Sequence, residues 1–507
     1  MSILISGSEL TCNDAVSVAR NNEQVQLAPE AKRRIRASKN VVDKYVEEGK
    51  VAYGITTGVG KLCNTLVSKE QVVQLQKNIA LSHACGIGTP LSIEETRAIM
   101  LVRANMLATG YSGVSLEIVD MLVSMLNAGI HPILPEKGGV GSSGSLSIGA
   151  HLALAISGNG EVVVENQRIP AAEAMRRKGL TPLILQTKEA LSLINGTHAM
   201  CGIGSLLISD MWDAVRSLEI AAAISLEALH GNTAAFDKRL NEVKRHPQQQ
   251  AAGRNITRLV EGSALYTKIK PRNVQDAYSH RCLPQVHGGT RDLLAFAQLL
   301  LEREMNSASD NPLVFADAET ILSGGNFHGQ IPAIALDNIA IACAVIARLA
   351  ERRISRMVDP QSSNLPAFLA PNSGLNSGLM IPQYIAASLV SEIKLLANPA
   401  SVDSIPTSGG QEDVVSNGTI AANKARLAVN NLQTIIGIEL ICAAQAMYLS
   451  GRQELGKGSE AAYHCIRKSI EPLQEDRFQE PDIIAATQLV SSGTLIREVE
   501  RVIGKLE

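Results

Sequence analysis

The sequence predicts a mainly α fold, in which a long central helix bundle follows a smaller, mixed α/β amino-terminal part. After about residue 200, long stretches rich in Ala, Leu and Ile repeat their apolar residues at three- and four-residue steps. Before that point, short apolar runs alternate with Gly, Asn and Ser. Only 3% of the residues are aromatic, which suits helices that pack closely through small aliphatic side chains. We therefore expect two parts, 1–200 and 201–507.

Two elements are predicted within the amino-terminal part. A helix over 94–110 is expected because Ser92 can cap its first turn, and Glu95, three residues later, completes a capping box. The apolar run Val162–Val164 and the pair Arg168–Ile169 flank Glu165–Gln167, and this pattern predicts a small β-hairpin.

Long helices are predicted throughout the second part. Pro332 stands where a first-turn proline belongs, and Arg352 and Arg353 lie near the carboxyl end of the same helix, where cations suit the helix dipole. The segments Ile339–Ala347 and Ile435–Ala446 are apolar on most faces, so we expect them to be buried centrally or against copies of the chain. The predicted helices span 205–230, 292–304, 332–356, 378–397 and 423–449.

Charge and cysteine usage exclude several classes of protein. The net charge at pH 7 is −2, which gives no reason to expect nucleic-acid or anionic-membrane partners. The first residues show neither the basic region nor the long apolar run of a signal peptide. The later apolar stretches are interrupted by Glu219, Asp337 or Lys394 before they reach membrane-spanning length. The eight cysteines are scattered, with no Cys-x-x-Cys pair and no ligand-spaced His. We expect a cytoplasmic protein with reduced thiols, no metal, and no membrane or nucleic-acid partner.

The most informative stretch is the Gly/Ser-rich segment Gly138–Gly149. In a tight bend, the amide nitrogen of Gly144 can attack the carbonyl carbon of Ser142. Loss of that oxygen and of the Ser143 hydroxyl as two waters leaves a five-membered imidazolone, which is a strong electrophile. Glycine is needed because its nitrogen is unhindered and its backbone tolerates strained dihedral angles. Composition alone also fits a flexible surface loop, so other segments must decide between the two readings.

Seven other segments of the chain also stand out. In chain order they are Tyr53–Gly58, Leu81–Ala84, Asn195–Thr197, Gln275–Ser279 with Arg281 and Cys282, Ser309–Val314, Gly324–His328 and Gln411–Asp413. Together with the Gly/Ser loop, these segments resemble the motifs of the histidine/phenylalanine/tyrosine ammonia-lyase family, at that family's approximate spacings. The resemblance covers nearly all 507 residues.

The resemblance implies a fumarase/aspartase-like helical architecture and a homotetramer whose active sites are shared between subunits. It also implies a small amino acid substrate and a 4-methylideneimidazole-5-one (MIO) group formed from Ser142, Ser143 and Gly144. In this chemistry the electrophile makes the substrate nitrogen a better leaving group, a base removes the β-proton, and a conjugated acrylate forms. Ser145 stands where the family has an aspartate, and this substitution leaves open whether the ring forms.

Catalytic roles follow from residue type and from the resemblance together. Tyr53 is the expected general base. Because a phenol titrates at about 10 in water, it needs a neighbouring donor or positive charge to act as a base near neutral pH. Ser143 supplies the methylene of the electrophile. Tyr278 matches the second active-site tyrosine, and Asn195 is expected to hydrogen-bond near the prosthetic group. Taken alone, Tyr53 would be read as a tyrosine that caps a turn.

Five residues are expected to bind the substrate. Arg281 matches the arginine whose planar fork holds the substrate carboxylate, with Gln275 beside it; a structural salt bridge is the alternative. Phe327 is expected to wall the pocket, and a packing role is its alternative. His83 and Glu412 match the residues that face the substrate imidazole in the histidine branch of the family. A buried carboxylate can accept the ring N–H, whereas a phenyl ring would leave it unpaired. The sequence therefore predicts conversion of L-histidine to urocanate.

Departures from the family pattern keep alternatives open. Besides Ser145, these are Thr56 and Val59 in the tyrosine loop, Gly410 before Gln411, and the polar residues His287 and Arg291 after Arg281. They permit a sister lyase that eliminates trimethylamine from ergothioneine without the MIO group, because trimethylammonium leaves readily. A phenylalanine or tyrosine ammonia-lyase or aminomutase is a further alternative. A non-catalytic helical assembly protein has little support, because a helix bundle needs none of the predicted site residues.

Overall fold

The structure is a computed structural model of the chain, and it describes residues 2–141, 143–451 and 454–507. Ser142, one of the three predicted ring-forming residues, lies outside the described residues. The chain forms two compact units, each built from several segments. Unit 1 comprises Met1–Ser209, Ala297–Asp337 and Pro399–Asn423, and unit 2 comprises Asp210–Phe296, Asn338–Asn398 and Lys424–Glu507. The boundary expected at residue 200 falls inside the long helix α9 (His198–Ala228).

Unit 1 is a mixed α/β unit, and it contains every strand of the described residues. Its sheets are small: β1 pairs in parallel with β2, whereas the pairs β3–β5, β4–β6, β6–β7 and β8–β9 are antiparallel. Its strands are β1 (Ile3–Ile5), β2 (Val25–Leu27), β3 (Ile87–Pro90), β4 (His131–Pro132), β5 (Pro135–Lys137), β6 (Glu161–Val164), β7 (Gln167–Pro170), β8 (Leu313–Phe315) and β9 (Thr320–Leu322).

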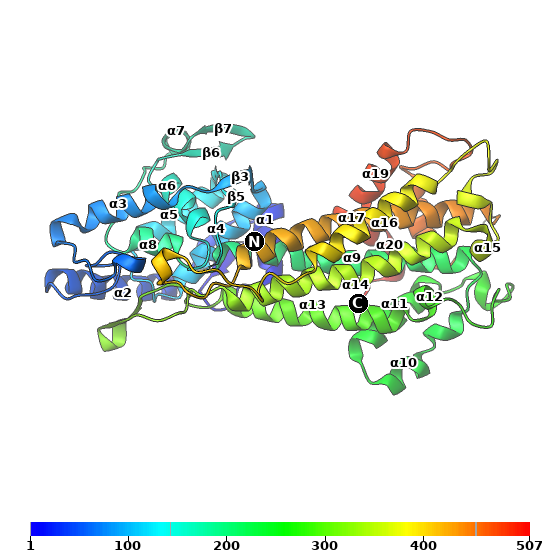
Figure 1. The fold of residues 1–507 in the computed structure, drawn as a ribbon, viewed down its shortest axis with the longest axis horizontal. Helices are drawn as coiled ribbons and strands as arrows, with labels where there is room; N and C mark the ends of the chain where they lie inside the picture. Colours follow the sequence, from blue (N-terminus) through cyan, green and yellow to red (C-terminus); the bar gives the residue numbers. More distant parts are fainter. Residues whose placement is uncertain (1, 142, 452–453) are drawn as a thin grey trace. The chain divides into compact units, whose positions relative to one another are not determined.

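The helices of unit 1 are α1 (Cys12–Asn21), α2 (Pro29–Glu47), α3 (Val72–His83), α4 (Ile93–Ala108), α5 (Leu116–Asn127), α6 (Leu146–Ile156), α7 (Ala171–Arg177) and α8 (Glu189–Ile194). Short 3₁₀ helices are η1 (Gly60–Leu62), η2 (Lys69–Gln71), η5 (Ala316–Ala318) and η7 (Ser408–Gly410). The hairpin β6–β7 lies beside α7 in the upper left of Figure 1.

Both elements predicted in this part are confirmed. Helix α4 begins after Ser92, whose Oγ accepts a hydrogen bond from the Glu95 amide at 3.2 Å, while the Glu95 carboxylate accepts from the Ser92 amide at 2.8 Å. The predicted hairpin is the pair β6–β7, in which Val164 lies opposite Gln167 across the turn.

All regular secondary structure in the described residues of unit 2 is helical. Its own helices are α10 (Lys238–Lys244), α11 (Pro247–Leu259), α12 (Tyr278–Arg281), α15 (Pro360–Ser363), α16 (Met380–Leu396), α18 (Lys457–Arg467), α19 (Glu480–Ser491) and α20 (Thr494–Ile503), with the 3₁₀ helices η3 (Thr233–Phe236), η4 (Ala264–Tyr266) and η6 (Ala367–Leu369). Four long helices contribute residues to both units: α9, α13 (Leu283–Met305), α14 (Gln330–Val358) and α17 (Gly418–Leu449). This content confirms the predicted mainly α class with a smaller mixed amino-terminal part.

The five long helices predicted from apolar periodicity are confirmed as α9, α13, α14, α16 and α17. Helix α13 begins earlier than predicted because Pro284 lies in its first turn and Gly288 and Gly289 do not break it. A Cβ added to Gly288 would lie 2.6 Å from the backbone of Gln249 in α11, so this glycine permits a close helix approach. Composition alone does not reveal such a packing role.

The apolar segments of unit 2 are largely buried within the chain itself. Every residue from Ile435 to Ala446 is buried, and a Cβ on Gly437 would lie 2.9 Å from the Thr487 amide of α19. In α14, Cys343 packs its Sγ 3.3 Å from Met211 Sδ of α9. The expected central burial is confirmed for Ile435–Ala446, whereas Ile341, Ala344 and Val345 in the segment Ile339–Ala347 are only half-buried.

Two of these helices, Gln330–Val358 and Gly418–Leu449, are long and apolar enough to cross a membrane. In the most apolar 18-residue stretch of each helix, 67% and 78% of the stretch, respectively, is buried inside the chain. Core helices of soluble proteins have the same length and composition, and these two belong to the packed interior.

Candidate active site

The Gly/Ser loop is tightly bent, and glycines make the bend possible. Gly141 and Gly144 face one another in an isolated β-bridge, with φ of +70° and +83°. A Cβ added to Gly144 would lie 2.0 Å from the carbonyl oxygen of Gly196, a contact that no other residue type could tolerate. The Gly196 amide donates to the Ser143 carbonyl at 3.1 Å, and the Ser145 amide donates to the Gly196 carbonyl at 3.0 Å. The bend of the loop is thus held by hydrogen bonds to Gly196 of the neighbouring Asn195–Gly196 segment.

A carboxylate lies next to the loop. Ser143 Oγ donates to Glu412 Oε1 at 3.3 Å, and Thr407 Oγ1 donates to Glu412 Oε2 at 2.7 Å. Glu412 is only half-buried, and Thr407 comes just before the 3₁₀ helix η7. The structure therefore brings together Ser143 and Glu412, which are 269 positions apart in the sequence.

Tyr53 lies in the same unit as Ser143 and Glu412, on a loop that packs into the core of this unit. Ile55 is fully buried in a cluster with Val41 and Val42 of α2. The Tyr53 hydroxyl accepts a hydrogen bond from the Gly60 amide at 3.0 Å. Burial raises the pKa of Tyr53 above its ordinary value, the charge of Glu412 adds to this rise, and the Gly60 hydrogen bond opposes it. A cation close to the Tyr53 hydroxyl would act in the opposite sense to Glu412.

The loop of Tyr53 also touches the segment that carries Glu412. The Lys61 amide donates to Ser408 Oγ at 3.2 Å, and a Cβ on Gly60 would meet the same Ser408 oxygen at 2.4 Å. The His328 ring contacts the Val414 carbonyl at 3.3 Å, which places the loop of Phe327 beside the same segment. Phe327 itself is half-buried, and its role as a pocket wall stays a prediction.

His83 is the last residue of α3, a helix that packs against α6 and α8. Its Nδ1 lies 2.9 Å from the Ile79 carbonyl and 3.0 Å from Ser82 Oγ. A carbonyl can only accept, so Nδ1 carries the proton and Nε2 is an acceptor in the neutral ring. His83 is half-buried, and Gly86, three residues further on, lies against the Gly/Ser segment, since a Cβ added to Gly138 would be 3.0 Å from Gly86 Cα.

Three of the remaining predicted residues, Gln275, Tyr278 and Arg281, belong to unit 2. The Arg281 guanidinium lies 4.4 Å from the centroid of the Tyr278 ring, and its Nε donates to the Asp276 carbonyl at 3.1 Å. Tyr278 is 69% exposed, and Gln275 is also exposed. No carboxylate within the described residues pairs with the Arg281 side chain. The terminal N–H groups of its guanidinium are therefore available to a ligand.

Helix α12, which carries Tyr278 and Arg281, is held by a buried ion pair that the sequence analysis did not foresee. Arg353 and Glu439 are both fully buried and form a two-pronged pair at 2.5 Å and 2.9 Å. Arg353 Nη1 donates to the Ser279 carbonyl at 3.2 Å. Helix α14 continues to Val358, so Arg353 lies before its last turn, and Glu439 is its charged partner. Burial lowers the pKa of the adjacent His280 to about 3.

His287 and Arg291, which follow Arg281 in sequence, both bind Glu219. Each places a nitrogen 3.3 Å from the same oxygen of Glu219, and all three side chains are buried in unit 2. The Arg291 guanidinium also lies 5.3 Å from the centroid of the Trp212 ring. Their polar character is thus explained by an internal network around a carboxylate.

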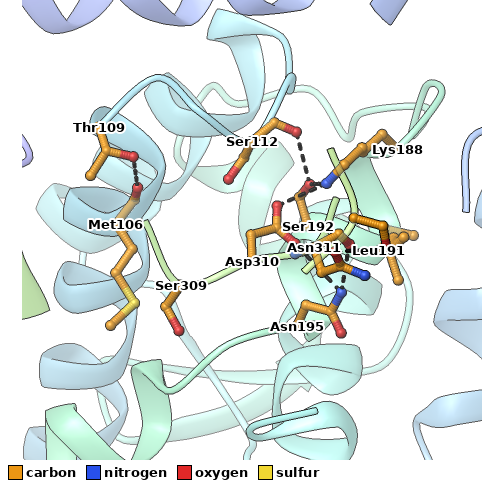
Figure 2. A network of polar contacts seen from close by, with 12 residues as sticks. Met106, Thr109, Ser112, Lys188, Leu191, Ser192, Asn195, Ser309, Asp310 and Asn311 are labelled. Carbon is orange, nitrogen blue, oxygen red and sulfur yellow. Dashed lines mark hydrogen bonds and ion pairs between the residues drawn. The ribbon is translucent and has the colours of Figure 1, made fainter. Parts of the chain in front are cut away.

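Asn195 is buried and directs its amide nitrogen at the segment Asp310–Asn311, where it donates to the Asn311 carbonyl at 3.0 Å. Figure 2 shows this amide beside the side chains of Lys188 and Asp310. Sequence reasoning missed both charged residues as parts of the site. Asp310 stood inside a recognised motif, but nothing in the sequence connected it with Lys188. Among the described residues, no group of three or more His, Cys, Asp or Glu side chains could hold a metal ion.

Comparison with known proteins gives one consistent result. The family model described as aromatic amino acid lyase matches residues 10–468. A histidine ammonia-lyase from Alkaliphilus oremlandii is 48% identical over 501 residues, which cover 99% of each chain. Among solved structures, histidine ammonia-lyase from Trypanosoma cruzi matches with a TM-score of 0.92 at 37% identity, covering 99% of this chain and 95% of the other. The ergothioneine-degrading enzyme ergothionase from Treponema denticola matches with a TM-score of 0.93 at 29% identity, covering 98% and 100%.

Proposed function

The chain belongs to the aromatic amino acid lyase family, and from this premise we propose that it eliminates ammonia from L-histidine to give urocanate. The fumarase/aspartase-like architecture expected from the sequence is confirmed by the likeness to solved lyase structures. The observation that carries the choice of histidine is the position of Glu412, whose carboxylate lies 3.3 Å from Ser143 Oγ. An imidazole ring bound there can donate its N–H to this carboxylate, whereas a phenyl ring cannot.

The residues present fit an MIO group. Gly144 sits in a cradle that a Cβ would fill, and Gly141 and Gly144 close the tight turn that cyclisation needs. Ser143 and Gly144, with Ser142, would form the ring. When formed, it supplies an electrophile that makes the substrate nitrogen a better leaving group. Ser145 replaces the family's aspartate, and its Oγ is buried with no hydrogen bond among the described residues, so ring formation does not use a carboxylate at this position.

The other residues bind, orient and move protons. Tyr53 removes the β-proton of the substrate, and the substrate ammonium favours its phenolate form. Arg281 and Gln275 hold the carboxylate, which leaves Tyr278 beside the reacting nitrogen. His83 offers the acceptor Nε2 to the imidazole, Phe327 walls the pocket, and Asn195 orients the loop. The proposed setting is the cytoplasm, with a free amino acid as the substrate.

Substrate choice can be tested at Glu412. Replacement of Glu412 by alanine should reduce kcat/KM for histidine by roughly 100-fold or more, because the imidazole N–H loses a charged acceptor. Activity on phenylalanine should stay very low in both proteins. The matched control is Asp413→Ala, since this neighbouring carboxylate is exposed and bonds no predicted site residue within the described chain.

The assay offers histidine, phenylalanine, tyrosine and ergothioneine in parallel, and it follows both the acrylate and the released amine. Release of trimethylamine from ergothioneine alone would keep the imidazole site and overturn the ammonia-lyase assignment. Preference for phenylalanine or tyrosine would show that Glu412 does not select an imidazole side chain.

We propose further that the chain is a homotetramer with shared active sites. Support comes from the family and from an apolar surface on α16, where Ile381, Tyr384 and Leu395 are 54%, 60% and 75% exposed. Sedimentation should give about four times the mass of one chain. Mixing Ser143→Ala subunits with Arg281→Ala subunits should restore activity that neither has alone, because some hybrid sites receive both intact residues. A stable, active monomer would contradict this proposal.

A further inference from the structure

A charged cluster without an assigned role lies in unit 1, in contact with Asn195 (Figure 2). Lys188 Nζ lies 2.9 Å from Asp310 Oδ2, and the two side chains are 0% and 1% exposed. Lys188 also donates to Ser192 Oγ at 2.9 Å. Desolvating two charges costs as much as their attraction returns, or more, so a pair this deep is not explained by stability alone.

Asp310 uses its second oxygen to orient the Asn195 amide. Oδ1 accepts from the Asn311 amide at 2.7 Å and from Asn195 Nδ2 at 3.5 Å, and the same Nδ2 donates to the Asn311 carbonyl at 3.0 Å. Both partners of this side chain are acceptors, so the amide nitrogen must face them. The carbonyl oxygen of Asn195 is turned away from the ion pair, as Figure 2 shows, and is left to accept a hydrogen bond on the other side.

The residue after Asn195 connects this cluster to the Gly/Ser loop. The amide and carbonyl of Gly196 bond Ser143 and Ser145, and Gly144 pairs with Gly196 in a parallel bridge. A shift of the Asn195–Gly196 turn must therefore move Ser143 and Gly144, which are two of the three residues proposed to form the electrophile. Lys188 fixes Asp310, Asp310 fixes Asn195, and the turn fixes the loop.

A third buried charge makes Asp310 the central member of the cluster. Arg103 is fully buried and donates from Nη1 to the Ser309 carbonyl at 3.3 Å. Burial lowers the pKa of Arg103 to about 10, and Asp310 opposes this effect. Burial also lowers the pKa of Lys188, again against the attraction of Asp310. One carboxylate thus faces two cations, and its removal would leave both of them without this counter-charge.

We propose that Asp310 and Lys188 are positioning residues for the lyase reaction, which orient the Asn195 amide and hold the Asn195–Gly196 turn against the electrophile loop. This inference rests on the proposed function, because the loop matters only if it forms the electrophile. Neither residue touches the reacting atoms; both act through Asn195.

The test uses two variants and a matched control in the full-length protein. Asp310→Asn keeps the shape but leaves Lys188 and Arg103 uncompensated, so this protein can fail to fold. The double variant Lys188→Met/Asp310→Leu removes both charges of the pair with side chains of similar volume, an exchange that buried ion pairs often tolerate. The control is Glu219→Gln, which removes a buried carboxylate that bonds His287 and Arg291 but no predicted site residue.

We expect the double variant to fold with a lower Tm than the wild type, because the buried Arg103 loses the counter-charge of Asp310, and kcat is therefore compared well below this Tm. Its kcat should fall by roughly 100-fold, since small misplacements of reacting groups have effects of this size, and its KM should change less. Intact mass should show a smaller fraction of chains that have lost two waters. The control should lose stability but keep its kcat at temperatures well below its Tm. A double variant with full ring content and wild-type kcat would overturn the inference.

A separate measurement distinguishes this failure from failure of the proposed function. If the wild type neither loses two waters nor acts on histidine, the proposed function is wrong. Crystal structures of the wild type and the double variant then decide the inference by themselves. An Asn195 amide with the same orientation in both would show that the ion pair does not position it, and a reoriented amide would support the pair's role.

Discussion

Replacement of Ser143 by alanine is expected to reduce ammonia release from histidine by roughly 10⁴-fold or more, because an alanine side chain has no hydroxyl to lose and cannot become the methylene of the electrophile. The fold should survive. Ser143 is half-buried, and its Oγ makes one hydrogen bond of 3.3 Å to Glu412, so the loss in stability should be about 1 kcal/mol.

Three measurements check this expectation. Ammonia release gives the rate, intact mass gives the loss of two waters in the wild type, and borohydride should inactivate the wild type alone. The matched control is Ser147→Ala, since Ser147 follows in the same segment and its buried Oγ makes no hydrogen bond in the described part of the chain. Unchanged turnover in Ser143→Ala would mean that the nitrogen leaves without an electrophile, as a trimethylammonium does, and would favour ergothioneine as the substrate.

Tyr53→Phe should lower kcat for histidine by roughly 10²- to 10⁴-fold, the usual contribution of a positioned general base. The phenol accepts one backbone hydrogen bond, from Gly60 at 3.0 Å, so the variant keeps the ring in place and removes only the proton acceptor. Tyr45→Phe is the control, because Tyr45 of α2 packs against the core cluster that contains Ile55 of the Tyr53 loop.

The pH profile adds a second readout for Tyr53. Burial and Glu412 raise the pKa of Tyr53, and only the deprotonated form can accept a proton. kcat/KM of the wild type should therefore rise with pH on the alkaline side, and the phenylalanine variant should lose this limb. A variant with an unchanged profile would exclude Tyr53 as the base.

The sequence predicted the fold class well because apolar periodicity reports helices directly. The capping box of Ser92 and Glu95 and the hairpin around Glu165–Gln167 are local signals, and both are confirmed. Start points of helices were less accurate, since the tolerance of α13 for Gly288 depends on the approach of α11. The site residues were located by motif order, and the structure groups Tyr53, Ser143 and Glu412 within one unit.

The charged partners inside the units could not be predicted from the sequence. Lys188 and Asp310 are 122 positions apart, and Arg353 and Glu439 are 86 apart, so no periodic pattern connects them. In a linear sequence each of these residues resembles a surface charge. Only packing shows that they are buried in pairs, and the same applies to Glu219 with His287 and Arg291.

Unit 1 is assembled from three stretches of chain that end only at Asn423. The loop at residues 138–149 therefore leaves the ribosome long before Thr407 and Glu412 exist to meet it. During synthesis the Ser143 hydroxyl has no carboxylate neighbour, and Gly196 lacks the Ser309 carbonyl that later lies against it. The ring closure proposed for this loop is therefore expected late, after these long-range contacts are complete. We expect a nascent or truncated chain that ends before residue 399 to keep the mass of the unmodified polypeptide.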